Sequence, residues 1–79
     1  MEERVKKVLN EINEEICKYQ GNQLWEDGII DSFDVMGIVA GLEEEFGIEV
    51  DAEYVIVENF SNADSVMVLM ASLLERGRL

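Results

Sequence analysis

The chain has 79 residues, 18 acidic side chains against 6 basic ones, no histidine and one cysteine. A single small domain over residues 1–79 is the expectation for this length, without a deep enclosed active site, and a chain without histidine has no serine–histidine or cysteine–histidine nucleophile pair. We therefore expect no catalytic residues and no metal site, and the excess of negative charge argues against nucleic acid as a partner.

The first predicted element is an amphipathic helix over about residues 2–19. Its apolar residues recur at helical spacing and are Val5, Val8, Leu9, Ile12, Ile16 and Tyr19. Cys17 is the lone cysteine and forms no internal disulfide, and the charged start has no apolar signal core, so a reducing cytoplasm is the expected compartment. No apolar run approaches the roughly 20 residues that a membrane span needs, so we expect no membrane insertion.

Residues 20–30 are predicted to form a loop, because Gly21, Asn22 and Gly28 favour turns. The loop also carries four apolar residues: Leu24, Trp25, Ile29 and Ile30. We expect these side chains to attach the loop to the core and so to fix the direction of the serine that follows.

A second helix is predicted over about residues 32–46, with Asp31 as its N-cap and Asp34 in its first turn. Ser32 lies at the start of this helix, where free N–H groups and the helix dipole favour an anion such as a phosphodiester by roughly 0.3–1 kcal/mol. One stripe of the helix is expected in the core: Val35, Ile38, Val39, Leu42 and Phe46. Ser32 is therefore the candidate attachment point for a phosphate-containing group.

A second apolar face of this helix begins beside the serine. It consists of Phe33, Met36, Gly37, Ala40 and Gly41, bordered by Glu43 and Glu44. A glycine inside a helix costs roughly 1 kcal/mol relative to alanine, which indicates close approach by another backbone. Burial would explain the face, and is the simpler explanation for Phe33 alone; the alternative is a docking surface for a partner.

The rest of the chain is also predicted to be helical. Residues 48–50 alternate like a strand, but three residues without a partner strand are interpreted as an extended connection, and a short helix is expected within residues 52–58. Residues 61–64 resemble a capping box that opens a last helix ending near Gly77. The predicted fold class is all-α, a small four-helix bundle of three longer helices and one short helix.

Two other candidate sites are rejected. Ser65 repeats the Asp-Ser pair, but it lacks both the preceding Asp-Gly-apolar-apolar run and the acidic cluster that follows Ser32, so we expect an ordinary helix-surface serine. A calcium loop starting at Asp27 would need oxygen ligands where the chain has Ile29 and Ile38.

The charged residues are unevenly distributed along the chain. Residues 20–74 contain no lysine or arginine, and residues 20–75 hold 13 of the 18 acidic side chains. Acidity of this kind keeps a domain in solution, and it also attracts partners that carry basic patches. The position of the serine favours a role of this acidity in attracting partners.

The middle of the chain resembles the acyl carrier protein family. The resemblance rests on Gly28-Ile29-Ile30-Asp31-Ser32-Phe33 and on Glu43-Glu44-Glu45-Phe46. It is strongest over residues 24–50, and the run from Trp25 to the serine is similar to that of stand-alone aminoacyl or D-alanyl carrier proteins. It implies that a separate phosphopantetheinyl transferase esterifies Ser32 with 4′-phosphopantetheine, whose thiol carries an acyl or aminoacyl group as a thioester.

The same resemblance implies a monomeric carrier that other enzymes act on and that is not itself an enzyme. Its partners would be the transferase, an acyl- or aminoacyl-activating ligase and an acceptor transferase, all with basic patches. Asp31 is expected to offer an oxygen ligand for Mg²⁺ during modification. Gly37 stands where many fatty-acid-type carriers have a glutamate, so we assign partner binding to other residues: Phe33, Met36, Ala40, Glu43 and Glu44.

The competing interpretation is an acidic helical interaction module that binds a basic protein and has no prosthetic group. Coexpression with a phosphopantetheinyl transferase distinguishes the two functions, because only a carrier gains the mass of the arm.

Overall fold

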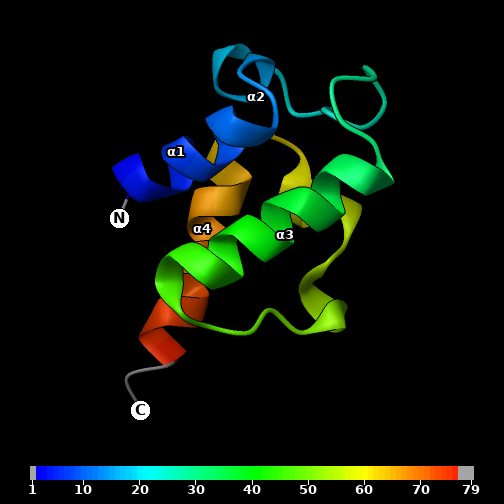
Figure 1. The fold of residues 1–79 in the computed structure, drawn as a ribbon. Coiled ribbons are helices and arrows are strands. Elements are labelled where there is room, and N and C mark those ends of the chain that lie inside the picture. The colour runs from blue at the N-terminus through cyan, green and yellow to red at the C-terminus, as the bar shows by residue number, and fades with distance from the viewer. Residues whose placement is uncertain (1, 77–79) are drawn as a thin grey trace.

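The structure is a computed structural model and describes residues 2–76 of the chain. Its helices are α1 (Glu2–Ile12), α2 (Glu15–Lys18), α3 (Ser32–Phe46) and α4 (Ala63–Arg76), and two 3₁₀ turns, η1 (Ala52–Tyr54) and η2 (Val57–Phe60), lie between α3 and α4 (Figure 1). No strand occurs within residues 2–76. The predicted all-α bundle of three longer helices and one short helix is confirmed.

The prediction of one helix over residues 2–19 is wrong, because α1 ends at Ile12 and a separate short helix, α2, begins at Glu15. The Asn13 side chain accepts the N–H of Glu15 at 2.9 Å and donates to the carbonyl of Ile29 at 3.1 Å. An asparagine that bonds neighbouring backbone in this way competes with the helical ladder. The short α-helix of the bundle is therefore α2, and the short helix expected within residues 52–58 takes the form of the two 3₁₀ turns.

The core lies between α1, α3 and α4 and is closed by the loop that precedes α3. Its largest fully buried side chains are Phe60, Leu9, Ile16, Leu24, Ile38, Leu42 and Met70. The predicted core stripe of α3 is confirmed, with Val35, Ile38 and Leu42 buried and Val39 and Phe46 packed against the core. The four predicted loop anchors are confirmed: Leu24 and Ile30 are buried in the core, and Trp25 and Ile29 are partly buried against it.

The two glycines in α3 face α1. A Cβ atom at Gly37 would lie 2.9 Å from Cδ1 of Ile12, and one at Gly41 would lie 2.7 Å from Cγ1 of Val8. Carbon atoms do not approach this closely, so any larger residue at Gly41 would push the buried side chain of Val8 aside. The close approach that the glycines indicated is therefore packing within the domain, and the predicted docking face does not include Gly37 or Gly41.

A small ion-pair cluster joins α1 to the C-terminal end of α3. Glu45 accepts a hydrogen bond from Nε of Arg4 at 2.8 Å, and Nζ of Lys7 lies 3.5 Å from its other oxygen. The Arg4 guanidinium also stacks 4.4 Å from the centre of the Phe46 ring. The hydrogen bond from Arg4, with the charge of Lys7, lowers the pKa of Glu45 below its ordinary value.

The lowered pKa predicts how Glu45→Gln changes stability with pH. Because ionised Glu45 is favoured in the folded state, its contribution is present at neutral pH and is lost as the pH falls below the ordinary value of 4.5. Thermal unfolding should therefore show a lower Tm for Glu45→Gln at pH 7 and no difference from wild type in acid. Glu44→Gln is the matched control, because Glu44 is the exposed neighbour; an equal drop for both variants would contradict the role of the ion pairs.

The segment after α3 is held by Glu43. α3 ends at Gly47, and Oε2 of Glu43 accepts the N–H of Val50 at 2.9 Å. Beyond this tie the chain runs through η1 and η2 and passes beside the N-terminal half of α3 (Figure 1). Glu43 therefore positions the segment that faces the serine.

The N-terminus of α4 differs in detail from the prediction. Asn62, and not Ser61, caps the helix, since its side-chain oxygen accepts the N–H of Ser65 at 2.8 Å. The predicted end near Gly77 lies outside the described residues. Among residues 2–76, no helix has the length and apolar character needed to cross a membrane.

Candidate functional site

The loop before α3 is attached on two sides, which fixes where α3 begins. The carbonyl of Leu24 accepts the N–H groups of Ile29 and Ile30 at 3.0 and 3.4 Å, and the N–H of Leu24 donates to Ser61 at 3.2 Å. Asn13 holds the carbonyl of Ile29 from the other side. Gly28 turns the chain with φ of +75°, a value that L side chains rarely adopt. The loop therefore holds the start of α3 against the core.

A second contact secures the outer part of this loop. The hydroxyl of Tyr19 donates to Oδ2 of Asp27 and accepts the N–H of Gln23 at 3.0 Å. The hydrogen bond to Asp27 raises the pKa of Tyr19, because the carboxylate stabilises the protonated phenol. The tyrosine therefore remains a donor at neutral pH and ties the loop to the end of α2.

Asp31 and Asp34 form a reciprocal capping box around the serine. Oδ1 of Asp31 accepts the N–H of Asp34 at 2.9 Å, and Oδ2 of Asp34 accepts the N–H of Asp31 at 3.3 Å. The predicted N-cap is confirmed, and the N–H groups of Ser32 and Phe33 are left without helical partners. Oδ1 of Asp31 accepts the cap hydrogen bond, and Oδ2 is the oxygen that takes no part in the cap.

The hydroxyl of Ser32 is available for chemistry. Ser32 is the first residue of α3, is exposed, and makes no side-chain hydrogen bond to any residue in the range 2–76. Ser65 is the contrasting case: it is half-buried, and its hydroxyl contacts Asn62 at 2.9 Å and Ser61 at 2.7 Å. The expectation of an ordinary surface serine at Ser65 is therefore wrong, because its hydroxyl belongs to the cap of α4.

Of the residues assigned to partner binding, four are exposed and one is hydrogen-bonded within the domain. Phe33 is 81% exposed and Met36 is 70% exposed, and Ala40 and Glu44 are exposed as well. Glu43 is half-buried and bonded to Val50. The exposed apolar side chains of α3 thus begin directly beside the serine, and Glu44 is the carboxylate left at their far end.

An apolar groove of about 550 Å³ opens beside Ser32, and we call it the serine groove. It is lined by Trp25, Ser32, Val35, Met36, Val55, Ile56, Val57 and Glu58. Sequence reasoning missed the wall formed by residues 55–57, which are exposed although all three are aliphatic. The signal was present as three consecutive β-branched residues, which fit a helix poorly. The groove therefore lies between α3, Trp25 of the preceding loop, and residues 55–58, which link η1 to η2 and form the start of η2.

Trp25, whose side chain lines this groove, has a buried polar atom without a hydrogen-bond partner. Its indole Nε1 is buried and has no acceptor among residues 2–76. An indole nitrogen can only donate, and a buried donor without an acceptor costs about 1–3 kcal/mol. Such an atom is uncommon in folded domains.

The electrostatic field at the serine is negative. Asp31 and Asp34 form the cap around it and Glu58 lines the same groove, whereas Arg4 and Lys7 are paired with Glu45 at the other end of α3. The serine end of α3 therefore carries carboxylates, and residues 20–75, which include it, contain no lysine or arginine.

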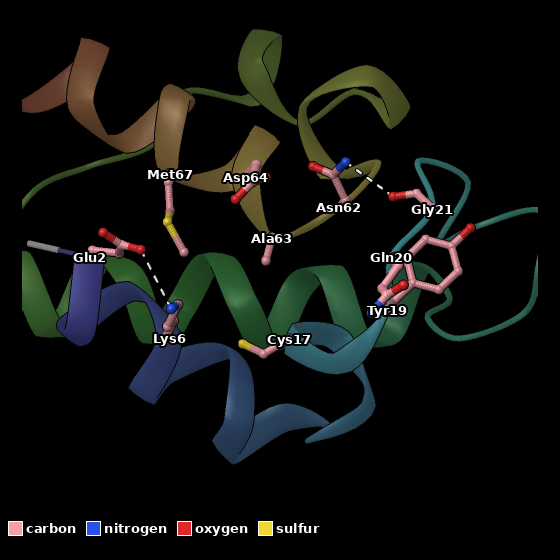
Figure 2. Close-up of a pocket in the computed structure, with 10 residues that line it drawn as sticks. All are labelled: Glu2, Lys6, Cys17, Tyr19, Gln20, Gly21, Asn62, Ala63, Asp64 and Met67. Carbon is pink, nitrogen blue, oxygen red and sulfur yellow. Dashed lines mark hydrogen bonds and ion pairs between the residues drawn. The ribbon is translucent and has the colours of Figure 1, made fainter.

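A second hollow of about 350 Å³ lies between α1, α2 and the start of α4 (Figure 2). Some of its polar side chains already have partners: Lys6 pairs with Glu2, and Asn62 donates to the carbonyl of Gly21 at 3.1 Å. Cys17 is one of its lining residues, and burial raises the pKa of its thiol, which favours the protonated form over the reactive thiolate. The serine groove is therefore the better candidate site.

Comparison with known proteins does not add to this description: no protein-family model, no curated protein and no solved structure matches the chain. The functional argument therefore depends on the residues and on their geometry.

Proposed function

We propose that the protein is an acyl or aminoacyl carrier in which Ser32 is esterified by 4′-phosphopantetheine. The observation that carries the proposal is the exposed, unbonded hydroxyl of Ser32 at the first position of α3, next to two free N–H groups and an open groove. When attached, the arm supplies a flexible thiol that holds cargo as a thioester. The chain's own part is to present the serine and to attract the enzymes that load and unload the arm.

The residues around Ser32 fit such a group. The N–H groups of Ser32 and Phe33 and the positive end of the α3 dipole favour a phosphodiester at this position. Asp31 and Asp34 would repel the same phosphodiester and so direct it outward, away from the cap. The adjacent groove is lined by Trp25, whose buried indole N–H has no partner among residues 2–76.

The proposal places the protein in a reducing cytoplasm, where the enzymes that use coenzyme A act. In support, Cys17 is the lone cysteine and lies partly buried as a free thiol. The loaded form would meet basic surfaces on a transferase, an activating ligase and an acceptor enzyme.

The direct test is intact mass. Purified protein is incubated with a broad-specificity phosphopantetheinyl transferase, coenzyme A and Mg²⁺, and a carrier should gain the mass of one phosphopantetheine per chain. Failure to gain mass, while an established carrier in the same tube is fully modified, would contradict the proposal. Incubating the loaded form with candidate activating ligases and reading the mass of the arm then identifies the cargo.

The exposed apolar surface favours one alternative, an acidic interaction module without a prosthetic group. Phe33 and Met36 are more than two-thirds exposed, as an interaction module also requires. In that case the mass test fails, yet a basic partner protein still binds this surface.

Substitution of Met36 tests the docking surface. Met36→Glu should slow modification by the transferase about tenfold, since an interface anchor contributes roughly 1–2 kcal/mol. Because the side chain is 70% exposed, the free energy of unfolding should change by less than about 1 kcal/mol. Initial rates of mass gain and urea denaturation give the two measurements.

Val68 offers a matched control for this substitution. It is also 70% exposed but lies on α4 and does not line the serine groove. Val68→Glu adds the same charge and should leave the loading rate unchanged, whereas Glu44→Lys should slow loading mainly at low salt. Equal rates for Met36→Glu and Val68→Glu would show that recognition lies elsewhere.

A further inference from the structure

Two properties of Trp25 are unexplained in the unmodified protein: its place in the serine groove and the unpaired N–H of its indole. The residue lies in the loop that holds the serine and lines the same groove as Ser32. Its Nε1 is the one buried side-chain nitrogen or oxygen in residues 2–76 that has no hydrogen-bond partner. Ser32 and Glu58 carry acceptor oxygens in the same lining, but neither is bonded to the indole N–H, and the other neighbouring side chains, Val35, Met36 and Val57, offer no oxygen acceptor.

We propose that Trp25 is a docking residue for the phosphopantetheine arm, and that its indole N–H donates to an amide carbonyl of the arm within the serine groove. This inference rests on the proposed function. It adds a resting position for the arm, which would lie along the groove between visits to partner enzymes instead of moving freely in solvent.

The chemistry of the groove favours the arm over other occupants. Glu58 is the only charged residue in its lining and is acidic, so the groove disfavours a free anion. The middle of the arm is uncharged, with two amide groups and an apolar dimethyl carbon, and these match one N–H donor among aliphatic walls. The arm also begins at Ser32, in the groove itself, so even a weak contact is favoured by a high effective concentration.

Docking must alter the surroundings of the indole. The nitrogen is buried in the bare domain, so a carbonyl reaches it only if the ring turns or the rim of the groove moves. Trp25 is the only tryptophan of the chain, so its signal is unambiguous. A change at this single indole therefore reports the docking directly.

The experiment compares the unmodified and modified forms of ¹⁵N-labelled protein by NMR, with intact mass confirming complete conversion. The single indole N–H cross-peak should move to lower field when the arm is attached, as expected for a new hydrogen bond to a carbonyl. Ser32→Ala treated with the same transferase and coenzyme A should keep the peak at its original position.

The outcomes separate this inference from the proposed function. A complete mass gain with an unmoved indole peak would overturn the docking of the arm and leave the carrier function intact. The absence of any mass gain would overturn both. A moved peak in Ser32→Ala would show that free coenzyme A occupies the groove, which overturns docking of a tethered arm.

A second comparison tests the N–H itself. Trp25→Phe keeps an aromatic ring but removes the donor, and the modified variant should lose the contacts between arm and groove that nuclear Overhauser effects detect in wild type. Val68→Asn, on α4 outside the groove, is the control and should retain them. Retention of these contacts in Trp25→Phe would overturn the hydrogen bond. If this variant fails to fold, the indole cross-peak of the wild-type protein before and after modification still tests whether the arm docks.

Discussion

Replacing Ser32 with alanine should abolish phosphopantetheinylation while leaving the domain folded. The hydroxyl of Ser32 is exposed and makes no side-chain hydrogen bond within residues 2–76. The capping box of Asp31 and Asp34 does not involve it. The free energy of unfolding should therefore change by less than about 0.5 kcal/mol. Intact mass after incubation with transferase and coenzyme A measures the modification, and urea denaturation measures the stability.

Ser65→Ala should give the opposite pair of results. Its hydroxyl bonds Asn62 and Ser61 at the start of α4, so losing it should lower the free energy of unfolding by about 0.5–1.5 kcal/mol. Modification should proceed as in wild type. If Ser32→Ala still gains the mass of the arm, or if Ser65→Ala fails to gain it, the carrier serine has been assigned wrongly.

Phe60→Ala should cause the largest loss of stability among single substitutions. Phe60 is 1% exposed and is the largest fully buried side chain, so its removal should cost about 3–5 kcal/mol. A domain of this size has a free energy of unfolding of roughly 4–12 kcal/mol, so the variant should be marginally stable or unfolded at 37 °C. Far-ultraviolet circular dichroism with urea titration measures the change.

Phe33→Ala is the matched control, because it makes the same chemical change on the surface. Phe33 is 81% exposed, so this variant should lose less than about 0.5 kcal/mol. Phe60→Leu should lose less than Phe60→Ala because most of the buried volume is kept. Similar losses for Phe33→Ala and Phe60→Ala would contradict the described core.

Much of this fold could be predicted from local patterns. The apolar spacing of residues 35–46 defines α3, and Asp31 followed by Asp34 marks its beginning. The break after Ile12 was missed, because the apolar period continues to Ile16 and only the bonds of the Asn13 side chain reveal the interruption. A pattern of apolar residues records which side faces the core, but not where the backbone leaves the helix.

The candidate site was predictable in part for the same reason. The serine and its cap come from one continuous stretch, so their arrangement follows from helix geometry. The wall formed by residues 55–57 depends on how the segment after α3 folds back, and the tie between Glu43 and Val50 that directs it is not visible as a motif. The glycines of α3 indicated close approach, but only the structure identifies α1 as the element that approaches.

The placement of charge along α3 has a consequence for the motion of the whole molecule. Arg4 and Lys7 are held at the C-terminal end of α3, about 20 Å along the helix axis from Ser32 at a rise of 1.5 Å per residue, while acidic side chains surround the serine. Glu43, Glu44 and Glu45 lie at that same C-terminal end, so both ends of α3 carry negative charge and the net charge of −12 favours neither end alone. A positively charged enzyme surface therefore attracts the domain as a whole. Orientation is then selected at short range, where the exposed Phe33 and Met36 beside the serine make contact.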